Sequence, residues 1–169
     1  MADIRIEHVY ECDQEVFWRE IFFSEEYNRR LFRDALEFPS FNVVSQTETD
    51  AELRRTVEVT PKLGDMPGAL KKLIGDNLGY RDDGVFDKRT KKFRTRITPN
   101  KLADKTTIEG TMWTEPLGER RCKRVFECRV ESRVFGVGGL LEKRVIDDLQ
   151  TSYSKAAQFT NAYVKEKGL

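Results

Sequence analysis

Two arginines share strand faces with apolar residues. Arg55 alternates with Leu53 and Val57, and Arg124 alternates with Phe126. Side chains two apart in a strand point to the same side. If those sides are internal, each guanidinium needs a partner, because an isolated buried charge is very costly. A pair of internal arginines could receive a carboxylate or phosphate head group. The alternatives are an internal salt bridge, or an edge position from which the charge reaches water.

His8 is the one histidine of the chain, and its spacing places it on the same strand face as Ile6 and Tyr10. Such a histidine is usually a hydrogen-bonded core residue, since a general base needs an orienting partner and a substrate within reach. The sequence contains no Ser/His/Asp or Cys/His set. Asp147 and Asp148 are adjacent, so on a helix they point in different directions. We therefore predict no catalytic residue, and we favour a binding protein over an enzyme.

The three cysteines, Cys12, Cys122 and Cys128, are widely spaced and odd in number. This pattern is not a disulfide framework, and it contains no Cys-x-x-Cys pair. With one histidine, a zinc site would need unusual ligands. We expect buried free thiols, no metal and no cofactor.

The charges of the chain nearly cancel, with 30 Lys and Arg against 29 Asp and Glu in 169 residues. A net charge of +1 supplies no general field to attract nucleic acid. The densest basic cluster spans residues 88–96, and in a hairpin its arginines Arg94 and Arg96 mark a solvated face. We expect no nucleic-acid partner.

Hydrophobic residues make up 38% of the chain, and 11 of them are Phe, which argues against disorder. No apolar run approaches the roughly 20 residues that span a bilayer. The start of the sequence lacks the basic and apolar stretches of a secretion signal, so we expect a cytoplasmic protein. We predict a single domain over residues 1–169.

The hydrophobic period alternates between that of strands and that of helices. Asp13 stands where it could cap the first helix, and Asp65 and Pro67 suit the start of the second. Seven antiparallel strands would bury one sheet face, and a long C-terminal helix is the obvious cover, which predicts an α+β fold. The predicted strands are 4–11, 40–48, 52–60, 80–87, 92–98, 106–114 and 121–134, and the predicted helices are 14–36 with a break near Ser24, 66–74 and 140–165.

Three segments carry a resemblance to a known family: residues 13–18 after the first strand, 66–75 before the middle hairpin, and 135–143 at the start of the last helix. The chain resembles a bacterial branch of the START-like superfamily, also called helix-grip and named for polyketide cyclases and lipid-transfer domains. The resemblance implies a strongly curved seven-stranded antiparallel sheet gripping the long C-terminal helix. It also implies an internal cavity for a lipid, sterol, polyketide or other apolar ligand.

Alternation within the strands proposes which residues line that cavity. Gly110 shares a face with Ile108 and Met112, where a larger residue could have filled the volume, and Ala156 and Ala157 lie on the apolar stripe of the last helix. Small residues can make room for a ligand or only for close packing. The predicted ligand-binding residues are Arg55, Val57, Val59, Met66, Leu70, Ile74, Phe93, Ile97, Ile108, Gly110, Met112, Arg124, Phe126, Leu149 and Tyr153.

The short helix 66–74 could gate the cavity mouth. Its leucine face could close over a ligand or enter a bilayer interface while Lys71 and Lys72 meet anionic lipid heads. Two lysines contribute about 1 kcal/mol each there, so the contact would be weak and transient. The alternative is a packed connector at one end of the sheet. The glycine-rich turn 136–139 could form a neighbouring loop of the mouth.

We therefore predict a protein that binds, and transfers or senses, a lipid or other hydrophobic ligand in an internal cavity. Two alternatives stay open: a cyclase- or hydrolase-like enzyme that uses the same cavity, and a protein-interaction module whose core is filled.

Overall fold

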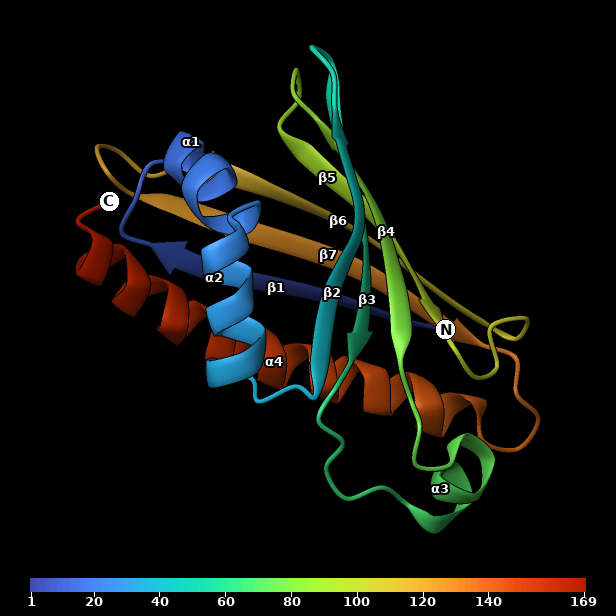
Figure 1. Ribbon diagram of the computed structural model, residues 1–169. Coiled ribbons are helices and arrows are strands. Elements are labelled where there is room, and N and C mark those ends of the chain that lie inside the picture. The colour runs from blue at the N-terminus through green and yellow to red at the C-terminus, as the bar shows by residue number, and fades with distance from the viewer.

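A computed structural model describes residues 1–169 as a curved sheet wrapped against one long helix (Figure 1). The helix α4 spans Gly138–Lys167. All seven strands pair antiparallel in the order β1-β7-β6-β5-β4-β3-β2, which confirms the predicted fold class. The strands are β1 (Ala2–Tyr10), β2 (Ser40–Glu48), β3 (Glu52–Thr60), β4 (Tyr80–Asp87), β5 (Lys92–Pro99), β6 (Thr106–Pro116) and β7 (Cys122–Ser132).

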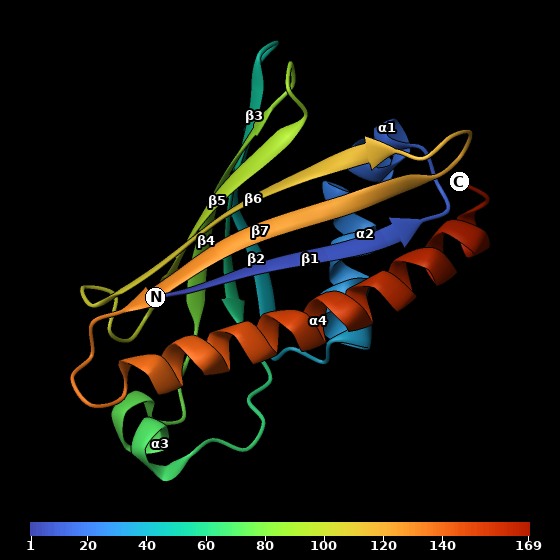
Figure 2. The same cartoon turned by 180° about the vertical axis from the view of Figure 1, so that it is seen from behind.

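The first and last strands of the chain lie side by side, so the N-terminal strand completes the sheet next to α4. In the β1–β7 register His8 is directly opposite Arg124. α4 runs along this part of the sheet and contacts both β1 and β7 (Figure 2). The other edge strand, β2, is mostly exposed, and a register shift between Val43 and Ser45 interrupts its pairing with β3.

The N-terminal helical segment consists of α1 (Gln14–Val16), the π-helical turn η1 (Phe17–Phe22), α2 (Glu25–Arg30) and a second π-helical turn, η2 (Leu31–Ala35). The predicted break near Ser24 is confirmed, because the Ser24 hydroxyl accepts a hydrogen bond from the Tyr27 amide and caps α2. Asp13 is the N-cap residue of α1, as predicted, but its side chain forms no capping hydrogen bond. Its carboxylate instead accepts a hydrogen bond from the Arg120 amide at 2.8 Å, and so ties the start of the segment to the β6–β7 turn.

The short helix α3 (Gly68–Ile74) connects β3 to β4 and lies next to the loop that precedes α4 in both views (Figures 1 and 2). Its N-cap residue is Pro67, so the prediction that Asp65 caps this helix is wrong. Leu70 and Ile74 pack with Leu141 in a small cluster separate from the main core.

The aromatic residues concentrate between the sheet and the N-terminal helical segment. Trp18 packs on Phe86 with ring centroids 4.5 Å apart, and Phe22 packs on Phe93 at 4.9 Å. The buried Trp18 indole also donates a hydrogen bond to the Thr114 hydroxyl at 3.0 Å. These contacts fix the helical segment over β4, β5 and β6, where it forms one wall of the interior.

The basic hairpin is solvated, as predicted. Arg94 and Arg96 are exposed, Lys88 pairs with Glu48 at 2.7 Å, and Lys91 pairs with Glu15. The three cysteines are buried and unpaired. None of the helices combines the length and the hydropathy of a bilayer-spanning segment.

Candidate functional site

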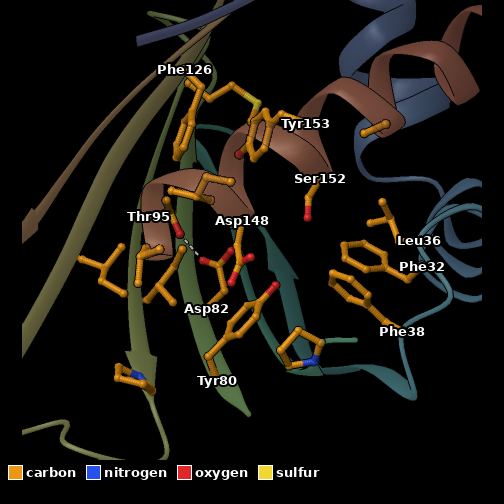
Figure 3. Close-up of a pocket in the computed structure, with 18 of the residues that line it drawn as sticks. Phe32, Leu36, Phe38, Tyr80, Asp82, Thr95, Phe126, Asp148, Ser152 and Tyr153 are labelled. Carbon is orange, nitrogen blue, oxygen red and sulfur yellow. Dashed lines mark hydrogen bonds between the residues drawn. The ribbon is translucent and has the colours of Figure 1, made fainter. Parts of the chain in front are cut away.

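A cavity of about 260 Å³ lies between the curved sheet, the N-terminal helical segment and α4. Of the 34 residues that line it, 22 are hydrophobic. Figure 3 shows residues from all three parts facing this space: Phe32 and Phe38 from the helical segment and its following loop, Asp82 from the sheet, and Tyr153 from α4. The cavity exists because the strongly curved sheet stands away from α4 along part of its length.

Ten of the fifteen predicted ligand-binding residues line the cavity. That they contact a ligand there stays a prediction. They come from β3, α3, β5, β6, β7 and α4, segments far apart in the sequence. These residues are Arg55, Ile74, Phe93, Ile97, Ile108, Met112, Arg124, Phe126, Leu149 and Tyr153.

The other five predicted residues lie elsewhere. Val57 and Val59 are buried on the inner face of β3 but do not reach the cavity wall. Met66 and Leu70 belong to the cluster that anchors α3. These four support the surroundings of the cavity and do not line it.

Gly110 is the fifth, and the idea that it leaves room for a ligand is wrong. A Cβ atom at Gly110 would come within 2.5 Å of the Phe126 ring and 3.1 Å of the Glu127 carbonyl oxygen. The ring of Phe126 fills the space that the missing side chain leaves. The glycine therefore permits close packing, and Phe126 presents its other side to the cavity.

Arg124 is 5% exposed and lines the cavity from β7. Its Nη2 atom donates to Nδ1 of His8 at 2.8 Å. The guanidinium carbon lies 4.5 Å from the ring centroid of Tyr153 and 5.2 Å from that of Tyr10. Burial and the Arg124 charge lower the pKa of His8. The imidazole is therefore a neutral acceptor in this contact. An internal salt bridge was one alternative that the sequence left open for Arg55 and Arg124, and neither arginine forms one.

Arg55 is 8% exposed and has different surroundings. It donates a hydrogen bond to the Phe22 carbonyl at 3.1 Å, and its guanidinium lies over the Phe22 ring at 4.7 Å. Burial lowers the pKa of Arg55 to about 10, while the nearby charge of Asp82 opposes that shift. Aromatic faces and a carbonyl are thus the direct partners of this cation.

Asp82 projects from β4 into the same cavity and accepts a hydrogen bond from the Thr95 hydroxyl (Figure 3). Burial raises the pKa of its carboxyl, against the opposing effects of Thr95 and Arg55. Burial also raises the pKa of Tyr80 and of Tyr153, the tyrosines that flank this part of the wall. Further polar groups of the wall come from other elements: Asn28 from α2, Thr106 from β6, and Asp148 and Ser152 from α4.

The cavity opens near α3. Two of its lining residues, Lys101 and Asp148, are exposed, and Leu78 and Leu102 are shared between the cavity wall and the cluster beneath α3. Figure 3 shows Asp148 and Ser152 of α4 across this space from Phe38.

Of the lining residues that the sequence analysis did not predict, two groups show what signal the sequence contains. Asp82 and Thr95 could have been found, because alternation places them on the inner faces of β4 and β5 with Phe86 and Phe93. The contribution of the N-terminal helical segment could not, since helical periodicity does not say which part of a sheet a helix covers. That segment and its following loop supply Phe17, Ile21, Phe22, Tyr27, Asn28, Leu31, Phe32, Leu36 and Phe38.

A family model described as "Protein of unknown function (DUF2505)" matches residues 5–164. The chain belongs to this family. The match begins within β1 and includes the other six strands and nearly all of α4. No curated protein matches the chain.

Solved structures share the fold at low sequence identity. An aromatase/cyclase, Zhui, from a Streptomyces species superposes with a TM-score of 0.69 at 7% identity, covering 99% of this chain and 96% of that one. Norcoclaurine synthase from Thalictrum flavum, in complex with dopamine and hydroxybenzaldehyde, has a TM-score of 0.64 at 13% identity and coverages of 98% and 87%. A START superfamily protein from Mycobacterium smegmatis has a TM-score of 0.58 at 11% identity, with 97% of each chain covered. These likenesses show that the chain has the helix-grip fold, and they establish nothing beyond the fold.

Proposed function

We propose that this DUF2505 protein binds a hydrophobic or amphipathic ligand, a lipid in the first instance, in its internal cavity and carries or senses it. The observation that carries the proposal is the cavity itself, whose wall is largely apolar with a few convergent polar groups, as is typical of small-molecule sites. A protein-interaction module with a filled core is disfavoured by this volume. The structural neighbours add support, because a norcoclaurine synthase of this fold is in complex with dopamine and hydroxybenzaldehyde.

Native mass spectrometry of the purified protein tests the proposal. We expect a fraction of the protein to carry a small molecule that organic solvent extracts, and we expect the stripped protein to take up members of a lipid panel. Liposomes should compete for the bound molecule if the protein is a carrier. A bare chain that takes up no member of the panel would contradict the proposed function.

A membrane surface is the proposed source of the ligand. Phe135 is fully exposed in the loop before α4, and Leu73 and Leu140 are 39% and 38% exposed on the neighbouring helices. Val134 and Val137 of that loop pack on the cluster beneath α3, so the exposed residues lie on adjoining segments near the cavity opening. Exposed aromatic and aliphatic side chains of this kind enter the interface of a bilayer.

The charges around these residues favour an anionic surface. Lys71, Lys72, Lys101, Lys105 and Arg133 at this end of the molecule form no ion pair with a carboxylate. Basic side chains near an anionic bilayer contribute about 1 kcal/mol each, and aspartates in the same segments offset part of that attraction. We therefore propose brief contact with the membrane, by a protein that otherwise resides in the cytoplasm.

Asp82 supports a second candidate function, an enzyme that uses the same cavity. A carboxyl whose pKa is raised by burial, beside Thr95, Tyr80 and an arginine, has the properties of a general acid. The Asp82→Asn variant separates the two functions. A carrier keeps its ligand uptake in this variant, whereas an enzyme loses turnover of its substrate while it still binds it.

A further inference from the structure

Arg124 is a buried cation without a buried anion. It forms no ion pair, and its contacts are a histidine nitrogen and the faces of Tyr10 and Tyr153. Its Nε atom is fully buried without any acceptor among the protein groups. Leaving a buried charged donor unpaired is costly, so a structure that retains one in a cavity wall has an unfilled requirement for an acceptor.

His8 cannot meet this requirement. A guanidinium only donates hydrogen bonds, so Nδ1 of His8 accepts and the neutral ring carries its proton on Nε2. The ring supplies one lone pair and no negative charge. The aromatic faces of the two tyrosines are weak substitutes for a carboxylate, at about 0.5–2 kcal/mol for each cation–π contact.

The other charges of the cavity wall point to the same conclusion. Asp82 and Arg55 influence each other's pKa, and Arg55 also donates to the Phe22 carbonyl, so this cation is partly compensated. Arg124 has no comparable partner, because no carboxylate pairs with it. Arg55 thus has a carboxyl nearby and Arg124 has none, so the wall retains one buried cation without an anion, which matches a ligand with a single negative charge.

The size of the cavity limits the body of that ligand. A volume of about 260 Å³ is slightly below the ~300–1,000 Å³ of most small-molecule sites. It accommodates one alkyl chain of medium length or one fused aromatic ring system, and it is too small for a lipid with two long chains.

We propose that the cavity binds an amphipathic monoacid, whose carboxylate pairs with the guanidinium of Arg124 and whose apolar body lies between Phe126, Met112 and the N-terminal helical segment. A planar carboxylate matches the fork of donors that a guanidinium presents. This inference rests on the proposed function, since it names the chemical class of the ligand that the cavity takes.

Calorimetric titration with matched probes tests the inference. The probes are decanoate with 1-decanol, and 2-naphthoate with 2-naphthalenemethanol, so that each acid has an uncharged partner of the same body. At neutral pH we expect the wild-type protein to bind one of the acids about tenfold or more tightly than its alcohol. The Arg124→Met variant should bind the acid and its alcohol alike, and Arg124→Lys should keep part of the preference.

Arg94→Met serves as the matched control, because it removes an exposed arginine from the opposite face of the sheet and should keep the wild-type preference. Circular dichroism checks that the variants are folded. If Arg124→Met does not fold, the comparison of Arg124→Lys with the wild-type protein serves as the test. Equal binding of acid and alcohol to the wild-type protein would overturn the monoacid while leaving the proposed function intact. A preference for the acid over the alcohol that survives in Arg124→Met but is lost in Arg55→Met would also overturn the pairing with Arg124. Binding of none of the four probes would count against the proposed function itself.

Discussion

The Nη2 atom of Arg124 lies 2.8 Å from Nδ1 of His8, directly across the pairing of β7 with β1. The contact joins the first strand of the chain to the last and holds the arginine against the cavity. It also places the one imidazole of the protein beside a permanent positive charge, which makes His8 a reporter of the charge in the cavity wall.

The first prediction concerns the titration of His8. Because burial and the Arg124 charge both disfavour imidazolium, its pKa should lie below the ordinary value of about 6.5. The neutral ring then contributes to stability above pH ~6.5, and this contribution declines as the pH falls toward the lowered pKa. The NMR signal of the single imidazole measures the titration directly. Arg124→Met should raise the pKa part of the way to 6.5, because burial of the ring remains.

Arg129→Met is the control for this titration, since it removes an exposed arginine from the same strand and should leave the pKa of His8 unchanged. A pKa of His8 at or above the ordinary value in the wild-type protein would contradict the described contact.

The second prediction concerns the packing of Gly110. In Gly110→Ala the new methyl group meets the Phe126 ring, so the ring must move or the strands must separate. We expect the free energy of unfolding to fall by about 1–3 kcal/mol, as in other overpacked cores. Urea denaturation measures the change. Gly139→Ala, where the added atom meets nothing within 4 Å, should be neutral or slightly stabilising, and equal effects at the two sites would refute the explanation.

The third prediction tests the cavity by filling it. Ile97 lines the cavity from β5, while its neighbour Thr98 points to solvent. Ile97→Trp should lower the affinity for a neutral fluorescent probe such as Nile red about tenfold or more, because the indole occupies the binding volume. Thr98→Trp adds the same group outside and should bind the probe as the wild type does. Undiminished binding in a folded Ile97→Trp variant would place the bound probe elsewhere.

The fourth prediction concerns the exposed loop before α4. Phe135 contacts little of the protein, so Phe135→Ala should change the free energy of unfolding by no more than about 0.5 kcal/mol. The same variant should bind vesicles containing anionic lipid about tenfold more weakly, as measured by co-sedimentation, since burying a phenylalanine contributes about 1.5–3 kcal/mol. Binding of the wild-type protein should also weaken at high salt.

Leu117→Ala is the matched control, because Leu117 is 43% exposed in the β6–β7 turn at the opposite end of the molecule (Figures 1 and 2). Equal sedimentation of the wild type and Phe135→Ala would contradict the proposed membrane surface. A wild-type protein that self-associates through Phe135 would instead identify this surface as a contact between two copies of the chain.

The sequence by itself determined the strands, the long helix and the class of the fold. Alternation identified the inward faces of β3, β5, β6 and β7 because the period of a strand decides the face of every residue once one side is buried. It placed Arg55 and Arg124 on those faces, but the structure was needed to show that both are buried and do not reach water at an edge. Local pattern was weaker at helix ends, where Asp13 and Asp65 have the right residue type but not the expected bonds.

Only the tertiary structure decided which inward residues meet empty space and which meet another side chain. Gly110 and Met112 share a face of β6, yet Gly110 packs against the Phe126 ring whereas Met112 lines the cavity. The curvature of the sheet and the position of the N-terminal helical segment determine that difference, and both depend on contacts between distant segments such as Trp18 with Thr114. For the same reason the pairing of Arg124 with an uncharged histidine could not be read from the sequence, since strand register brings together residues 116 positions apart.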